Sequence, residues 1–388
     1  MRILYHHRTR GRHVEGVHIR GIVHALRKLG HAVTVQSFPG ADPEQEPAVQ
    51  ANSGRGRLAG AVARLPGVLF EFLELGYNLV TALRMSVAIR RLQPQLIYER
   101  YSLFLFATIW LARRRGIPVI LEINDSALVE RVRPLRLKGL ARRIESWCLR
   151  RCTGLVFISD YFRQQAEAAY GAIAPSVISP NAADLARFDP ARFDRAHLRA
   201  ERGLADRVVC GHIGVFAQWH GVDGFVDAIS LRLAEVPQLA LVLVGDGRTL
   251  PAVRALVAAR GLADRVLLPG RVAHDEIASW IACMDYAVLP DSNQYGSPMK
   301  LFELMAMGVA VVAPDYAPVA EVIDDGHTGW LFPRRQTNLC VQRVLDLAAQ
   351  VDARERVGAA ARDYIARERQ WRNNAEQLLT LLPAGAMP

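Results

Sequence analysis

A loop, a helix and a buried strand follow one another in the stretch Gly296-Ser-Pro-Met-Lys-Leu-Phe-Glu-Leu-Met-Ala-Met-Gly-Val-Ala-Val-Val-Ala-Pro-Asp315. Pro298 suits the first position of a helix, because its φ is already helical and its missing N–H would be unpaired there. Gly308 is the expected helix end, and the β-branched residues that follow it predict a strand. A helix that leads into a buried strand is typical of α/β proteins with parallel sheets.

Lys300 lies in the first turn of this predicted helix, which is an unfavourable place for a cation. A helix start carries unpaired N–H groups and a partial positive charge. An anionic ligand such as a phosphate would explain the lysine, because it would bind both the lysine and the N–H groups. Glu303, one turn further on, could accept hydrogen bonds from sugar hydroxyls. The pair suggests a nucleotide-sugar site, and a surface lysine with a solvated glutamate is the structural alternative.

Strands and helices alternate along the first half of the chain. A helical pattern runs from Val17 to Leu29 and ends at Gly30. The expected strands lie at residues 3–5, 31–36, 96–98, 118–124, 154–159 and 176–181. Alternation of this kind implies a parallel sheet with helices on both faces.

The pattern restarts after about Asp184, with strands expected at residues 207–214, 240–247, 265–268, 286–290 and 309–313. We therefore expect an α/β protein with two doubly wound Rossmann-like domains, 1–185 and 186–360, whose parallel sheets face a central cleft. In such sheets ligands bind beyond the carboxyl ends of the strands. A polar, arginine-rich helix from about Ala359 to Leu382 is expected to cross back onto the first domain, as part of residues 361–388.

Composition agrees with two soluble domains. The length of 388 residues fits two domains, and an apolar fraction of 51% is enough for two cores. Five scattered cysteines show no zinc spacing and no Cys-x-x-Cys, which predicts reduced thiols in the cytoplasm. The first residues do not read as a signal peptide, and no stretch of about 18 uncharged apolar residues occurs, so no membrane-spanning segment is expected.

Positive charge is concentrated in the first half of the chain. Residues 1–190 contain 27 Arg and Lys against 15 Asp and Glu, whereas the remainder contains 21 against 23. A basic half predicts a surface that meets an anionic partner, and solvated arginine-rich faces are the alternative. Membrane lipid or a lipid-phosphate acceptor would place the protein at the inner face of the cell membrane. Nucleic acid is not expected, because the chain lacks a recognition helix and a basic stripe with interleaved aromatics.

The helical pattern of residues 66–89 is unusual, because its polar residues form one narrow stripe. The stripe consists of Glu71, Glu74, Asn78 and Thr81, and apolar side chains cover the rest. A helix that faces one sheet needs only about a third of its surface apolar. The excess would pack on a neighbouring helix or a second subunit, or it would enter a membrane interface. In the second case Arg55, Arg57, Arg64, Arg84, Arg90 and Arg91 would lie near lipid headgroups.

Segments along most of the chain occur in an order that is typical of one enzyme family. In the second half they are Val244-Gly-Asp-Gly247, Val266-Leu-Leu-Pro-Gly-Arg-Val272, Tyr286-Ala-Val-Leu-Pro-Asp291, the opening stretch, and Glu321-Val-Ile-Asp-Asp-Gly-His-Thr-Gly-Trp-Leu-Phe332. These resemble the strand ends and the Glu-x7-Glu helix of retaining GT-B glycosyltransferases of family 4. Tyr98-Glu-Arg-Tyr-Ser102 and Leu121-Glu-Ile-Asn124 resemble a bacterial subgroup that builds surface polysaccharides, and Pro180-Asn-Ala-Ala-Asp184 resembles the family's domain junction. The resemblance implies transfer of a sugar from a UDP- or GDP-linked donor to a glycan or glycolipid acceptor, with retention.

The resemblance also implies a donor site in the second domain. Glu303 corresponds to the second Glu of Glu-x7-Glu, which binds the nucleotide ribose, and Tyr295 stands in place of the first. Backbone N–H groups from about Ser297 to Leu301 would meet phosphate or sugar oxygens. Further donor contacts are expected at Gly214, Gly245, Arg271, Val272, Pro298 and Met299.

Three residues are candidates for the catalytic role. Val215 and His220 occupy the positions of the family's phosphate-binding Arg and Lys, so Lys300 would supply part of the missing charge. Asn124 aligns with the family's donor-side His. We therefore predict Asn124, His220 and Lys300 as catalytic, because groups aimed at the departing diphosphate stabilise the transition state. No Asp-x-Asp occurs, so neither a cofactor nor an obligatory metal is expected, and these cations with the helix N-terminus would replace a divalent ion.

The acceptor is expected on the first domain. Gly16, in the loop after the first strand, would lie near the acceptor or the diphosphate, and His18 and Glu122 are further candidates. Hydrogen-bonding roles at strand ends are the structural alternative for Glu122 and Asn124. Two other functions stay open: a nucleotide-sugar epimerase on the same fold, and a degenerate, non-catalytic glycosyltransferase homologue.

Overall fold

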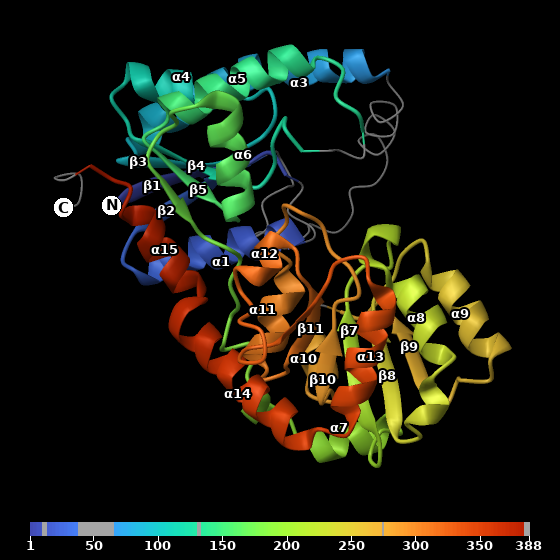
Figure 1. Cartoon of the computed structure of the whole chain (residues 1–388). Helices are drawn as coiled ribbons and strands as arrows, with labels where there is room; N and C mark the ends of the chain where they lie inside the picture. Colours follow the sequence, from blue (N-terminus) through green and yellow to red (C-terminus); the bar gives the residue numbers. More distant parts are fainter. Residues whose placement is uncertain (10–13, 38–65, 130–132, 274, 384–388) are drawn as a thin grey trace, which may run out of the picture. The chain divides into compact units, whose positions relative to one another are not determined.

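The computed structural model describes residues 1–9, 14–37, 66–129, 133–273 and 275–383 (Figure 1). The chain forms two compact units. The first unit is Met1–Pro180 with Trp371–Pro388, and the second unit is Asn181–Gln370. Among the arginines considered for a membrane interface, Arg55, Arg57 and Arg64 lie outside the described residues.

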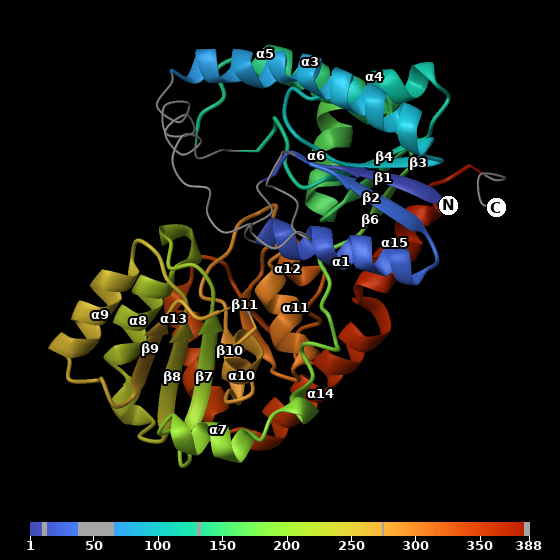
Figure 2. The ribbon, with the colours of Figure 1, turned by 180° about the vertical axis from the view of Figure 1, so that it is seen from behind.

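The first unit is built on a six-stranded parallel sheet with the strand order β2-β1-β3-β4-β5-β6. Its strands are β1 (Arg2–His6), β2 (Ala32–Gln36), β3 (Leu96–Arg100), β4 (Val119–Ile123), β5 (Gly154–Phe157) and β6 (Ser176–Ile178). Its helices are α1 (Val14–Lys28), α3 (Gly67–Leu92), α4 (Ala107–Arg114), α5 (Lys138–Arg151), α6 (Asp160–Tyr170) and α15 (Trp371–Leu379). Helices α1 and α15 lie on one side of the sheet, and α3, α4 and α5 lie on the other (Figures 1 and 2). Each strand predicted in this half is present.

The second unit repeats the architecture, with the strand order β12-β11-β10-β7-β8-β9 and all described neighbours parallel. Its strands are β7 (Val208–Ile213), β8 (Leu239–Val244), β9 (Val266–Gly270), β10 (Tyr286–Val288), β11 (Val311–Pro314) and β12 (Trp330–Phe332). Its helices are α7 (Arg195–Glu201), α8 (Val222–Ser230), α9 (Leu250–Ala259), α10 (Ile277–Ile281), α11 (Met299–Ala306), α12 (Ala317–Ala320), α13 (Thr337–Ala348) and α14 (Val351–Glu368). The predicted pair of parallel α/β sheets is therefore confirmed, and β12 is an additional strand.

Strand β8 shows why this sheet needs helices on both faces. All six of its residues are buried. Ala240, Val242 and Val244 belong to one hydrophobic cluster, whereas Leu239 and Leu241 belong to another. Since side chains alternate along a strand, the two clusters lie on opposite faces of the sheet.

The prediction of a single helix over residues 359–382 is wrong, because this segment forms two helices: α14 ends at Glu368 and α15 begins at Trp371. At the break the N–H of Ala183 donates to the carbonyl of Arg369 (3.0 Å), and Ala183 pairs with Gln370 as an isolated bridge. Helix α15 then packs on α1 within the first unit. A Cβ on Gly21 would lie 2.4 Å from the ring of Trp371, so this contact needs a glycine.

Helix α3 turns its polar stripe inward and its apolar side chains outward. Glu71, Asn78 and Thr81 are buried. Eight apolar side chains of α3 are 40% to 73% exposed: Val68, Leu69, Phe72, Leu73, Leu79, Val80, Leu83 and Val87. Among the described residues, α3 is the one helix long and apolar enough to cross a membrane, by length and composition alone.

The polar stripe of α3 faces inward because it caps two other helices. The side-chain oxygen of Asn78 accepts hydrogen bonds from the N–H groups of Phe106 (2.9 Å) and Ala107 (3.0 Å), where α4 begins. Glu71 accepts from the N–H groups of Arg136 (2.7 Å) and Leu137 (2.6 Å), just before α5. Neither α4 nor α5 has a side-chain cap of its own. Since unpaired N–H groups at a buried helix start are costly, these contacts determine which side of α3 faces the protein.

Asn78→Ala is expected to lower the free energy of unfolding of the first unit by about 2–4 kcal/mol, because it leaves buried backbone groups without partners. The amide of Asn78 also donates to the carbonyl of Phe104 (2.7 Å). Calorimetric unfolding of the full chain measures the change. Thr81→Val is the matched control on the same helix, since the buried hydroxyl of Thr81 makes no hydrogen bond within the described residues. Equal losses in the two variants would contradict the capping role of Asn78.

Candidate functional site

Two glycine turns pack against each other at the carboxyl ends of β7 and β8. The N–H of Gly214 donates to the carbonyl of Val244 (3.0 Å), and the N–H of Phe216 donates to the carbonyl of Asp246 (2.9 Å). Gly214 and Gly245 have φ values of +145° and +144°. A Cβ on Gly245 would lie 1.8 Å from the carbonyl oxygen of Gly214, so only glycine allows this backbone contact.

Lys300, in the first turn of α11, extends to the first of these turns. A Cβ on Gly214 would lie 2.8 Å from the Nζ of Lys300. This Nζ is buried and has no hydrogen-bond partner in the described part of the chain. Burial lowers the pKa of Lys300 to about 7. A buried ammonium group without a partner is costly unless an anion binds it, which makes this position a candidate anion site.

Two histidines lie near Lys300. His212 is buried in β7, and His220 ends the short helical turn Gln218–His220. Burial, followed by the charge of Lys300, lowers the pKa of His220 to about 4 and that of His212 well below its usual value. The Nδ1 of His220 and the Nε2 of His212 have no hydrogen-bond partner among the described residues. Both rings are therefore neutral near pH 7, where His220 offers a hydrogen bond rather than a charge.

The loop before α11 is held by two asparagines. The side-chain oxygen of Asn293 accepts hydrogen bonds from the N–H groups of Tyr295 (3.1 Å) and Gly296 (2.5 Å). Asn181 binds Ser297 through both its backbone N–H (3.0 Å, to Oγ) and its side-chain amide (2.6 Å, to the carbonyl). Pro298 is the N-cap rather than the first helical residue and provides no side-chain cap. Pro298 therefore offers no side-chain acceptor to the N–H groups at the start of α11.

Glu303 is buried in α11, one turn after Lys300. Burial raises the pKa of Glu303 to about 7, and the positive charge of Arg187 opposes this shift. A carboxyl group with this pKa can accept or donate a hydrogen bond near neutral pH.

The remaining donor-side candidates lie at neighbouring strand ends. The N–H of Gly245 donates to the carbonyl of Gly270 (2.9 Å), so the turns after β8 and β9 touch, and Arg271 with Val272 follows directly. Arg271 is exposed and Val272 is half-buried. The structure brings Lys300 together with Gly214 and Gly245. It adds His212, Asn181 and Asn293, which the sequence interpretation missed.

A second polar cluster surrounds Glu122 at the end of β4 in the first unit. The buried carboxylate of Glu122 accepts hydrogen bonds from Arg100, from the hydroxyl of Tyr98 (3.0 Å) and from the amide of Asn124 (2.7 Å). The Nε2 of His18 lies 3.0 Å from the same carboxylate. Burial alone would raise the pKa of Glu122, but the charges of Arg100 and His18 and these hydrogen bonds lower it well below its usual range. Glu122 is therefore an ionised scaffold that orients Asn124 and His18.

In the first unit, Gly16 belongs to α1, and the segment after Asn124 is hydrogen-bonded to α5. Gly16 lies in the first turn of α1, so its expected place in a loop is wrong. Beyond Asn124, Glu145 of α5 accepts hydrogen bonds from the hydroxyl of Ser126 (2.5 Å) and the N–H of Ala127 (2.6 Å). Of the predicted acceptor-side residues, Glu122 therefore lies at the end of β4, whereas Gly16 and His18 lie in α1.

Comparison with known proteins identifies the family. A model described as Glycosyltransferase Family 4 matches residues 16–187, and one described as Glycosyl transferases group 1 matches residues 207–350. The chain belongs to this family of GT-B glycosyltransferases. The predicted GT-B fold class is confirmed by solved structures at 17% identity, a level that shows the fold alone. Sucrose-phosphate synthase from Thermosynechococcus elongatus has a TM-score of 0.73, with 98% of both chains covered. Anabaena Alr3699/HepE in complex with UDP has a TM-score of 0.70, with 98% of this chain and 99% of that chain covered.

Curated relatives are more similar in sequence but are matched over part of their length. The alpha-D-kanosaminyltransferase of Streptomyces kanamyceticus is 27% identical over 65% of this chain and 66% of its own. A GDP-mannose-dependent alpha-(1-6)-phosphatidylinositol monomannoside mannosyltransferase of Mycobacterium tuberculosis is 29% identical over 59% of this chain and 61% of its own. The chain thus matches less than two thirds of the length of these relatives.

Lys300→Met is expected to stabilise the second unit at pH 6, and this gain should shrink as the pH rises from 7 towards 10. The pKa of Lys300 is about 7 in the folded protein and 10.5 in its ordinary state. Between these values the unfolded chain holds a proton that the folded chain has lost, so wild-type stability rises with pH. Melting temperatures of both proteins across this range test the sign. Lys138→Met, at an exposed lysine, is the control for loss of a charge, and a pH-independent difference at Lys300 would contradict the buried ammonium.

Gly245→Ala is expected to destabilise the second unit by at least about 2 kcal/mol, because the new Cβ would collide with the turn that carries Gly214. Gly224→Ala in α8 is the matched control. A Cβ there meets nothing within 4 Å, so alanine should be neutral or add up to about 1 kcal/mol. Urea unfolding of both variants measures the contrast. Similar stabilities would show that the two turns do not need their close contact.

Proposed function

We propose that the chain transfers a sugar from a UDP- or GDP-linked nucleotide sugar to a glycan or glycolipid acceptor, with retention and without an obligatory metal. The observation that carries this proposal is the buried, unpartnered Nζ of Lys300 beside Gly214. Membership of family 4 supports retention, and the donor named for the Mycobacterium tuberculosis relative supports a GDP-linked sugar as one candidate. We also propose a cytoplasmic location, which the five free, buried cysteines support.

Lys300 would act on the departing diphosphate. Breaking the bond between sugar and diphosphate leaves negative charge on the phosphate oxygens. An ammonium group already in place stabilises that charge more in the transition state than in the ground state. A bound phosphate would raise the pKa of Lys300 from about 7 and keep the side chain charged. The uncapped start of α11 and a neutral His220 would donate further hydrogen bonds to the phosphate.

Glu303 would bind the ribose of the donor. Its carboxyl group is buried one turn beyond Lys300, so a nucleotide whose phosphate meets Lys300 would place its ribose within the same region. Ribose hydroxyls would then satisfy a carboxyl group whose pKa is raised to about 7 by burial. Tyr295, Ser297, Met299 and Leu301 would contribute through the loop and first turn, and Arg271 and Val272 through backbone near the base.

Residues of the first unit would serve the acceptor side. Glu122 holds the amide of Asn124 at 2.7 Å and the ring of His18 at 3.0 Å. This leaves the side-chain carbonyl oxygen of Asn124 free to accept a hydrogen bond from a bound sugar, and Gly16 in the first turn of α1 would lie near the acceptor. Asn124 would be the catalytic group of this unit, and Glu122 would position it.

Titration calorimetry with UDP, GDP and ADP should show binding of at least one nucleotide. Lys300→Met should weaken that binding by about 10- to 100-fold, since a hydrogen bond to a charged group contributes about 1.5–3 kcal/mol. Glu303→Gln should weaken it by about tenfold, whereas Glu355→Gln, at an exposed position of α14, should not. A folded wild-type protein that binds none of the three nucleotides would identify a degenerate homologue. Unchanged affinity in Glu303→Gln would remove the ribose assignment.

The reaction class follows from turnover with the matching nucleotide sugar. A transferase should release nucleotide much faster when a glycan or glycolipid acceptor is present. Formation of an epimer without an acceptor would identify an epimerase instead.

A further inference from the structure

The exposed side of α3 is an apolar surface of the described residues that the proposed reaction does not use. We define the outer face of α3 as Val68, Leu69, Phe72, Leu73, Leu79, Val80, Leu83 and Val87. Leu79 and Leu83, one turn apart, are 73% and 72% exposed. An exposed apolar patch of this extent marks an interaction site rather than a random surface.

The outward orientation of this face is fixed by the contacts on the opposite side of the helix. Glu71 and Asn78 hold the starts of α5 and α4 through hydrogen bonds of 2.6–3.0 Å. Turning α3 around, or drawing it across a bilayer, would break these bonds and leave buried N–H groups unpaired. The helix can therefore present its apolar side only while lying flat along the first unit.

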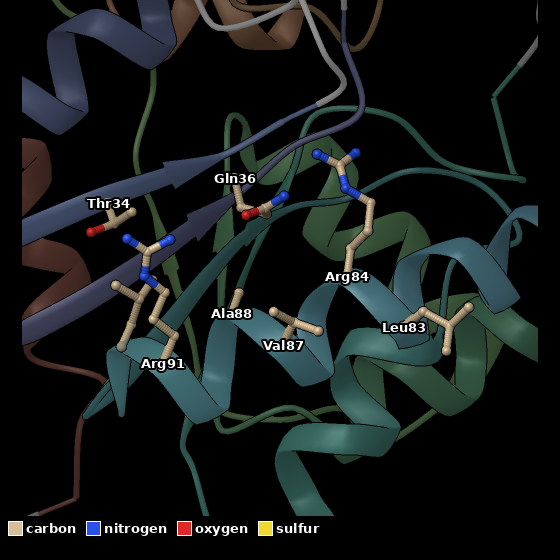
Figure 3. Close-up of a pocket in the computed structure, with 8 residues that line it drawn as sticks. Thr34, Gln36, Leu83, Arg84, Val87, Ala88 and Arg91 are labelled. Atoms are coloured by element: carbon tan, nitrogen blue, oxygen red, sulfur yellow. The ribbon is translucent and has the colours of Figure 1, made fainter.

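Positive charge borders the outer face. A pocket of about 520 Å³ lies between α3 and the edge strand β2, and Arg84 and Arg91 line it together with Thr34 and Gln36. Figure 3 shows both arginine side chains extending from α3 toward β2, next to Val87 of the outer face. One guanidinium nitrogen of Arg84 donates to the carbonyl of Ser37 (2.7 Å), which holds the side chain at the pocket. Two arginines beside hydroxyl and amide groups suit a phosphate monoanion or diester.

We propose that the outer face of α3 binds the surface of an anionic phospholipid bilayer. The helix lies in the membrane plane, the leucines and valines of the outer face enter the acyl boundary together with Phe72, and Arg84 and Arg91 bind lipid phosphates. Apolar side chains beside arginines are the composition of helices that lie in such an interface.

A second copy of the chain fits this face less well. An isologous contact would bring the same surface against itself, so the positive charges of Arg84, Arg90 and Arg91 from both copies would lie in one interface. The first 190 residues already carry 27 basic against 15 acidic residues, which adds to the repulsion. An anionic bilayer has the complementary charge, so electrostatics favour lipid over self-association.

Flotation of the full chain, without any nucleotide sugar, tests the proposal independently of the reaction. The protein should bind vesicles of phosphatidylcholine with phosphatidylglycerol and bind vesicles of phosphatidylcholine alone more weakly. Leu79→Gln with Leu83→Gln should weaken binding by about tenfold or more, because two apolar anchors are lost. Arg91→Gln should weaken binding to the anionic vesicles by about fivefold.

Matched variants distinguish binding through the outer face of α3 from the general effect of losing an exposed leucine or arginine. Leu231→Gln, at a leucine 71% exposed in the second unit, and Arg343→Gln, at an exposed position of α13, should leave vesicle binding unchanged. Unchanged melting temperatures would show that the α3 variants still fold, as their exposure predicts. Failure of the wild-type protein to bind anionic vesicles, or equal binding by the double leucine variant, would overturn the proposal. A wild-type dimer that the double leucine variant dissociates, without vesicle binding, would assign the face to a second copy.

Discussion

Compensation of buried charge is the constraint on which both polar clusters depend. Glu122 has no contact with solvent, yet Arg100, His18, Tyr98 and Asn124 surround its carboxylate and keep it ionised. Lys300 is the opposite case, because its buried Nζ has no hydrogen-bond partner among the described residues. A compensated charge stabilises a fold or orients its neighbours, whereas an uncompensated one can bind a ligand that supplies the counter-charge. This difference separates the positioning role proposed for Glu122 from the binding role proposed for Lys300.

The second unit holds that uncompensated charge within closely packed backbone and core. The turns that carry Gly214 and Gly245 are in close backbone contact, since a Cβ on Gly245 would lie 1.8 Å from the carbonyl oxygen of Gly214. Met299, Leu301 and Phe302 are buried on either side of Lys300, so α11 cannot rotate the lysine out without exposing its core face. Packing around α11 therefore keeps Lys300 buried despite the unfavourable free energy of burying its ammonium group. Such local destabilisation is usual at functional sites.

The sequence predicts the strands well, because strands depend on local patterns. Apolar runs ended by glycine predict strand ends, and the misplaced Lys300 predicts an anion site without knowledge of its neighbours. What it misses are effects of contacts distant in sequence. The break between α14 and α15 coincides with pairing of Ala183 with Gln370. His212 looks like one polar residue in an apolar strand, and only the fold places it near Lys300.

The orientation of α3 shows the same limit most clearly. Periodicity shows that the helix has a polar stripe, but it does not tell which side faces the protein, and the usual rule would bury the apolar side. The deciding partners are the N–H groups of Phe106 and Ala107, and those of Arg136 and Leu137. Each such N–H left unpaired would cost about 1–3 kcal/mol, so the four together favour the observed orientation by about 4–12 kcal/mol. A bilayer that covers the outer face would remove the free-energy cost of exposing its apolar side chains to water. The polar stripe of α3 would then explain both the capping of α4 and α5 and the proposed affinity for lipid.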